Sequence, residues 1–265
     1  MQLIFLRHFW GVTLPRREAF ARFAERGYAG VEATLHEDLP LLKSLTAEHG
    51  FRLSGMAYTD GTDVEAHFDS LRTQVDRWLE LGATQINAHS ARDAWPTARS
   101  VEFYGRCVEY ERTLPILVTH ETHRGRAFFS PWATRDILAQ VPDVRLCCDF
   151  SHWVCVAERL LGDCDAEVAL ASSRCRHLHA RVDYEEGPQV PDPSALEYAP
   201  HLAAHERWWQ SIVTAQREAG AAELTIVPEY GPPNYLHTTP HTNAPVADLD
   251  HVVEWATTRL RQQLK

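Results

Sequence analysis

Three carboxylates of this sequence each follow an apolar run. Glu121 follows PILVTH, Asp149 follows VRLCC, and Glu229 follows LTIVP. An ionised carboxylate buried among apolar side chains is costly unless a cation or hydrogen-bond donors compensate its charge. A bound metal ion is therefore the simplest expectation for a site that gathers all three.

A His-x-His pair offers a fourth ligand. His177 and His179 lie in CRHLHARV, another run with apolar flanks. Three carboxylates and one imidazole form an oxygen-rich set that suits one Mn²⁺, Mg²⁺ or Co²⁺ ion in octahedral geometry, with water or substrate in the open positions; Zn²⁺ is less suited. The residue types alone do not decide which histidine binds, and either could be an ordinary hydrogen-bonded histidine.

The elements that must position these residues are short apolar runs that alternate with amphipathic segments. Strands are predicted at 3–9, 30–35, 52–58, 84–90, 114–121, 144–150, 175–182 and 224–230. Helices are predicted at 15–27, 63–82, 98–112, 130–140, 154–171, 200–219 and 247–263, with Asp63 as an N-cap.

Eight strands that alternate with helices are the pattern of a (β/α)8 barrel, in which catalytic groups lie at the carboxyl ends of the strands. The pattern predicts one barrel domain over residues 1–265. An open doubly wound sheet is the alternative, but no Gly-x-Gly-x-x-Gly turn follows any strand, so nothing favours dinucleotide binding.

The composition limits the partners. The net charge of -10 disfavours nucleic acid and anionic membranes, and no apolar run reaches the roughly 18 residues of a membrane span. Six cysteines at irregular spacings, with no Cys-x-x-Cys, indicate thiols in a reducing cytoplasm. A small-molecule substrate is expected, and a homo-oligomer is left open.

On these residues the chain resembles the xylose isomerase-like TIM barrels, a superfamily of sugar isomerases, ketose 3-epimerases, inosose dehydratases and endonuclease IV. The matching features are GYAGVEA at strand 2, Glu121, the Asp-x-x-His of Asp149 and His152, the His-x-His of strand 7, and Glu229. The resemblance implies that Glu121, Asp149, His179 and Glu229 hold one divalent metal. It also implies that the two glutamates move protons and that His152 faces the substrate.

Further substrate contacts are expected from residues at or just beyond the strand ends. They are His8, Trp10, His89, His123, Arg124, His152, His177 and Arg181. Trp10 would stack on a sugar ring, and Arg124 or Arg181 would meet a carboxylate or phosphate. Trp95 and Trp153 are either further pocket walls or core residues.

These features predict a metal-dependent isomerase or epimerase that acts on a carbohydrate. The metal would bridge two oxygens of a hydroxy-ketone, and two glutamates would remove and return the proton between them through an enediolate. If a neighbouring hydroxyl leaves instead, the same residues give a lyase or dehydratase of a keto-sugar or keto-inositol.

Two further alternatives are a non-catalytic sugar-binding barrel and an endonuclease IV-like repair enzyme. The resemblance counts against repair, because strand 3 reads GMAYTD and the segment after strand 7 contains PDPSALEY. The strand 3 histidine and the later Asp-x-His of endonuclease IV are therefore missing. The ketose epimerases also place an arginine farther beyond the strand 7 histidine than Arg181 lies.

Overall fold

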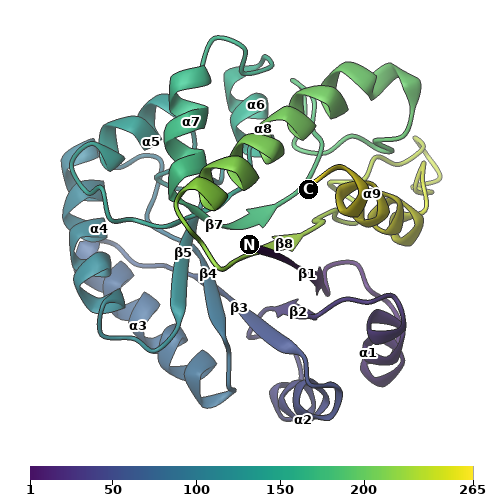
Figure 1. Cartoon of the computed structure of the whole chain (residues 1–265), viewed down its shortest axis with the longest axis horizontal. Coiled ribbons are helices and arrows are strands. Elements are labelled where there is room, and N and C mark those ends of the chain that lie inside the picture. Colours follow the sequence, from purple (N-terminus) through teal and green to yellow (C-terminus); the bar gives the residue numbers. More distant parts are fainter. Residues whose placement is uncertain (265) are drawn as a thin grey trace.

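The computed structural model describes residues 1–264, and its centre is a closed ring of eight parallel strands (Figure 1). The strands are β1 (Gln2–His8), β2 (Gly30–Ala33), β3 (Arg52–Tyr58), β4 (Gln85–His89), β5 (Leu117–Glu121), β6 (Leu146–Cys148), β7 (Cys175–His179) and β8 (Glu223–Val227). Each strand pairs with the next, and β1 pairs with β8 to close the ring. The predicted (β/α)8 barrel is confirmed.

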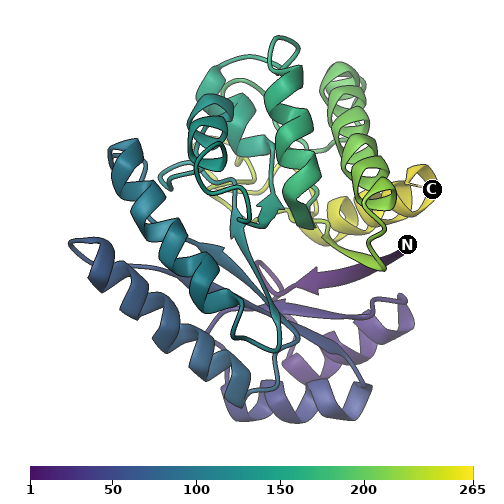
Figure 2. The same cartoon turned by 60° about the vertical axis from the view of Figure 1, so that its left-hand side comes forward.

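Helices surround the ring, as the two views in Figures 1 and 2 show. They are α1 (Arg16–Glu25), α2 (Leu39–His49), α3 (Val64–Glu80), α4 (Thr97–Glu111), α5 (Pro131–Leu138), α6 (Ser151–Ala157), α7 (Asp165–Arg174), α8 (Ala199–Glu218) and α9 (Leu249–Gln263), with a short 3₁₀ turn, η1 (Leu196–Tyr198), before α8. Asp63 caps α3 as predicted, because its side chain accepts a hydrogen bond from the backbone N–H of Ala66.

Two helices differ from the sequence-based expectation. The single helix predicted at 154–171 is wrong: α6 ends where Glu158 adopts a left-handed conformation with φ of 52°, and α7 begins only at Asp165. The predicted helices do not include α2, although Asp38 caps its first turn and Gly50, with φ of 61°, ends it.

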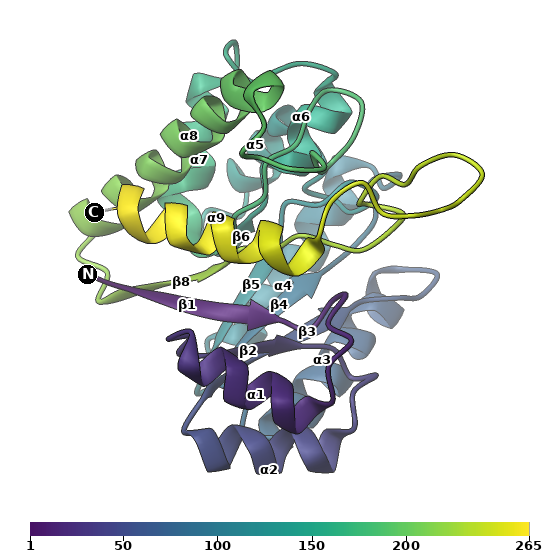
Figure 3. The same ribbon diagram turned by 90° about the vertical axis from the view of Figure 1, so that its right-hand side faces the viewer.

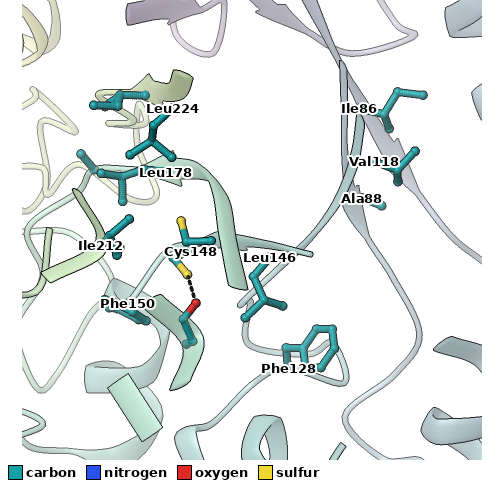
Figure 4. Close-up of a cluster of buried hydrophobic side chains, with 14 of the residues drawn as sticks. Ile86, Ala88, Val118, Phe128, Leu146, Cys148, Phe150, Leu178, Ile212 and Leu224 are labelled. Atoms are coloured by element: carbon teal, nitrogen blue, oxygen red, sulfur yellow. Dashed lines mark hydrogen bonds between the residues drawn. The ribbon is translucent and has the colours of Figure 1, made fainter. Parts of the chain in front are cut away.

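The outer faces of the strands pack against the helices. Figure 4 shows part of this layer, with Ile86 and Val118 from neighbouring strands and Ile212 from α8. These three side chains are almost completely buried. Full burial of such a side chain contributes roughly 1.5–3 kcal/mol, so the layer is a main source of stability.

The inside of the barrel holds a hydrogen-bonded polar network. Gln85 lies at its centre and contacts Ser54, His177 and Thr225 at 3.0–3.2 Å. Glu32 extends the network, because it accepts hydrogen bonds from Ser54 at 2.7 Å and contacts His177 at 3.0 Å. These buried polar groups satisfy one another and support the residues above them at the carboxyl end.

The two ends of the barrel carry different features. Figure 3 shows both chain termini near the amino end of β1, while loop 228–248 extends from the opposite end.

Within residues 1–264, no helix combines the length and apolar character needed to cross a membrane. All six cysteines are free thiols, and all but Cys155 are buried.

Candidate active site

Four ligand-type residues converge at the carboxyl end of the barrel. Glu121 and His179 end β5 and β7, Asp149 follows β6 directly, and Glu229 lies two residues beyond β8. One ligand atom from each residue lies within 4.8 Å of the others, and all four residues are buried. The barrel therefore brings together residues that are separated by as many as 108 positions, from Glu121 to Glu229.

His179 has the surroundings of a metal ligand. Its Nε2 lies 2.8 Å from Oε1 of Glu32, which orients the ring. Its Nδ1 is buried without a hydrogen-bond partner and lies 3.4 Å from carboxylate oxygens of both Glu121 and Glu229. A carboxylate on one imidazole nitrogen and a metal on the other is a common arrangement in metalloproteins, so these residues fit a divalent cation. The other histidine, His177, has both ring nitrogens engaged by Glu32 and Thr225.

Arg181 places a fixed positive charge beside the same carboxylates. Its guanidinium pairs with Asp149 and lies 3.0 Å from Glu229, while its Nε donates to Ser151 at 3.1 Å. The side chain is buried. Arg181 thus neutralises part of the negative charge of the cluster and holds two of its carboxylates in place.

Burial and neighbouring charges set the protonation of the cluster. Burial favours protonation of Glu121, but the charges of His89 and His179 outweigh it and hold the pKa of Glu121 well below its usual range. For Glu229, His179 and Arg181 outweigh burial and lower the pKa to about 2. Burial raises the pKa of Asp149 to about 6, although Arg181 opposes this. Glu121 and Glu229 are therefore ionised at neutral pH.

A pocket of about 300 Å³ opens beside this cluster. Its lining includes these residues predicted from the sequence: His8, Trp10, His89, Glu121, His123, Arg181 and Glu229. It also includes five residues that are not among the predicted site residues: Thr34, Met56, Tyr58, Arg126 and Tyr235. Trp10 meets Tyr235 edge to face, with 4.7 Å between ring centroids, so the two aromatic rings form one wall.

Three predicted substrate contacts lie outside this lining. Arg124 extends over the ring of Tyr235, 5.3 Å from its centroid. His152 lies behind Arg181 and accepts a hydrogen bond from its guanidinium at 3.0 Å. His177 lies deeper in the barrel, within the polar network, so it supports the site from below.

Trp153 and Trp95, the two tryptophans that could be pocket walls or core residues, lie outside the pocket lining. Trp153 is fully buried and donates from its indole N–H to the carbonyl of Phe128 at 2.9 Å. Trp95 packs edge to face on His67, with 4.7 Å between ring centroids. Trp153 is therefore a core residue, and Trp95, which is half-buried, packs against the core.

Two supporting residues could have been found from strand periodicity. Asn87 lies two positions before His89 on β4, and a period of two places both on one face of the strand. The amide of Asn87 donates to Oε2 of Glu121 at 2.5 Å, and Nε2 of His89 lies 2.8 Å from the same oxygen. Glu32, in the middle of β2, similarly contacts His179.

The fold and this cluster define an enzyme-like (β/α)8 barrel with a buried, metal-compatible carboxylate centre. Residues 20–247 match the family described as xylose isomerase-like TIM barrel. The chain belongs to this family. A comparison with curated protein sequences finds no match.

Solved structures share the fold at low sequence identity. D-allulose 3-epimerase from Methylomonas sp., in complex with D-allulose, has a TM-score of 0.63 and 18% identity, covering 99% of this chain and 97% of that one. The probable 3-DHS dehydratase AsbF from Bacillus anthracis has a TM-score of 0.60 and 12% sequence identity, and the match covers 98% of this chain and 99% of that one. Endonuclease IV from Thermus thermophilus has a TM-score of 0.58 and 12% sequence identity, and the match covers 99% of this chain and 98% of that one. These similarities establish the architecture.

Proposed function

We propose that this protein is a divalent-metal-dependent isomerase or epimerase of a sugar or sugar derivative. The observation that carries the proposal is the placement of two ionised glutamates, Glu121 and Glu229, in one pocket beside a buried histidine nitrogen that forms no hydrogen bond. The shared fold with a D-allulose 3-epimerase supports the substrate class. The proposed reaction moves a proton between carbon and one of the glutamates.

Glu121, Asp149, His179 and Glu229 would hold the metal. When bound, it supplies positive charge that stabilises the negative charge developing on substrate oxygens during proton removal. The fit rests on the buried Nδ1 of His179, which lies at equal distances of 3.4 Å from two carboxylates.

The residues of this chain would divide the proton transfer between them. Asn87 and His89 both approach Oε2 of Glu121, which orients this carboxylate as the base that removes the proton. Arg181 anchors Glu229, which would return the proton. Trp10 and Tyr235 would cover the sugar and exclude water.

A lyase is the second candidate function. Elimination of a hydroxyl needs an acid near the leaving group, and His89 lines the pocket with its Nε2 2.8 Å from Glu121. The fold shared with the probable 3-DHS dehydratase AsbF is consistent with this chemistry. Product mass separates the candidates, because dehydration removes one water and epimerisation leaves the mass unchanged.

Metal loading tests the proposed centre. We expect chelator-stripped protein reloaded with Mn²⁺, Mg²⁺ or Co²⁺ to bind one ion per chain by elemental analysis. Asp149→Asn should weaken binding about 10–100-fold, because a neutral amide replaces a carboxylate ligand. Asp183→Asn is the matched control, since Asp183 is also buried but lies 3.0 Å from His205 and outside the four-residue cluster. A stoichiometry near zero, or an Asp149→Asn protein that binds as tightly as wild type, would contradict the proposal.

The position of Arg126 in the pocket lining leads us to expect an anionic group on the substrate. Its guanidinium lines the pocket, yet its hydrogen bonds go to the backbone carbonyls of Thr59 at 2.9 Å and Ala91 at 3.4 Å, and no carboxylate pairs with it among residues 1–264. Arg126→Gln should raise KM about 10–100-fold for an acidic sugar, the equivalent of one charged hydrogen bond, with a smaller change in kcat. Arg106→Gln is the control, because Arg106 lies on α4 outside the lining and pairs with Glu65 at 2.7 Å. An equal rise in KM of Arg126→Gln for a neutral sugar would refute the assignment.

A further inference from the structure

A second pocket, of about 330 Å³, lies at the amino end of the barrel. Its lining comes from the end of α4, the segment before β6 and the junction of α7 with β7: Val108, Glu111, Arg112, Asp143, Val144, Arg145, Arg174 and Arg176. Four arginines thus face one cavity in a chain whose net charge is -10. This concentration of positive charge runs against the overall composition.

Both carboxylates of this second pocket already have partners. Asp143 pairs with Arg112 at 2.5 Å. Oε1 of Glu111 lies 2.7 Å from Nε2 of His120, a fully buried histidine. Neither carboxylate therefore forms an ion pair with the other three arginines.

Arg145, Arg174 and Arg176 have no carboxylate partner within residues 1–264. The Nε of Arg174 is buried without any hydrogen-bond partner. Arg176 donates only to neutral acceptors, the backbone carbonyls of Ser173 and Cys175 and the side chain of Gln216. Burial lowers the pKa of Arg176, and the charges of Arg145 and Arg174 lower it further, so both of these arginines repel the guanidinium of Arg176.

The helix ends account for only part of this charge. A helix carries about half a negative charge at its C-terminus, so α4 and α7 together offset about one of the three unpaired positive charges. Arg145 precedes β6 and Arg176 lies within β7, so neither belongs to a helix. The remaining charge and the unpartnered Nε of Arg174 call for an anion.

We propose that this second pocket binds a small phosphate-bearing anion. Guanidinium groups match phosphate oxygens with paired hydrogen bonds, and about 300 Å³ is the lower end of the range for small-molecule sites. The site is separate from the candidate active site. Arg145 directly precedes β6 and Asp149 directly follows it, and the four residue steps between them span roughly 13 Å in an extended strand.

Calorimetric titration with inorganic pyrophosphate, at constant ionic strength, tests the proposal. We expect one binding site on the wild-type chain and an affinity about tenfold or more weaker in Arg174→Gln and in Arg145→Gln. Arg72→Gln is the control, because Arg72 is an exposed residue on α3 paired with Asp69. Circular dichroism of each variant checks that it is folded. Arg145 is exposed, so Arg145→Gln should leave the packing of the core unchanged.

A second pair of titrations separates the sites and the ligand classes. Glu121→Gln should bind pyrophosphate like wild type, because Glu121 lies at the other end of the barrel; loss of binding in this variant would place the anion in the active site and overturn the proposal. Citrate should bind at least tenfold more weakly than pyrophosphate. Equal binding of citrate, no binding of pyrophosphate, or unchanged affinity in Arg174→Gln would each overturn it.

Discussion

Replacing Glu121 with glutamine is expected to lower solvent-deuterium exchange into the substrate carbon by about 10²–10⁴-fold, the usual contribution of a positioned general base. Glutamine keeps the shape of the side chain and one oxygen that can ligate a metal, but it cannot accept the proton. Metal affinity should fall less than the exchange rate. Proton NMR of a ketose substrate in D₂O, with metal-loaded protein, measures the exchange directly.

Glu111→Gln provides a matched control for this experiment. Glu111 is also buried and contacts a histidine, His120, at 2.7 Å, but it lies at the amino end of the barrel. Its replacement should cost stability and leave exchange per folded molecule nearly unchanged. If Glu121→Gln exchanged at the wild-type rate, the proton-transfer role would have to pass to Glu229 and a histidine, and Glu121 would be at most a ligand.

Replacing Arg181 with glutamine is expected to destabilise the metal-free protein by about 3–5 kcal/mol, the cost of leaving buried charges without their partner. Arg181 is buried and pairs with both Asp149 and Glu229. A divalent metal would supply positive charge to the same two carboxylates. Adding metal should therefore stabilise Arg181→Gln more than wild type, and metal affinity should rise in the variant. Denaturant unfolding with and without Mn²⁺, together with calorimetric metal titration, measures both effects.

Arg7→Gln is the comparison for Arg181. Arg7 is equally buried, but its nearest carboxylate is Asp250 at 3.8 Å, away from the metal-compatible cluster. This variant should lose stability without recovering it when metal is added. Equal recovery in both variants, or an Arg181→Gln protein as stable as wild type without metal, would show that Arg181 does not serve as the counter-ion of the cluster.

Local sequence was sufficient to predict the barrel. Each strand is a short apolar run because its outer face is buried under helices, as Ile86 and Val118 are. Each long helix carries an apolar stripe, and the cap of α3 at Asp63 is a local hydrogen bond. The split between α6 and α7 was missed because it depends on one left-handed residue, Glu158, of a type that gives little signal for that conformation.

By itself, the sequence determined the eight-stranded architecture and placed Glu121, Asp149, His179 and Glu229 at strand ends, because strand order and strand ends follow from local patterns. Tertiary structure alone decided the roles of residues whose partners are distant in the chain. Arg181 is a buried counter-ion of Asp149, and Arg126 is a pocket arginine without a carboxylate partner among the described residues. Whether such a charge has a partner depends on residues from other strands. Only closure of the barrel brings those residues within hydrogen-bonding distance.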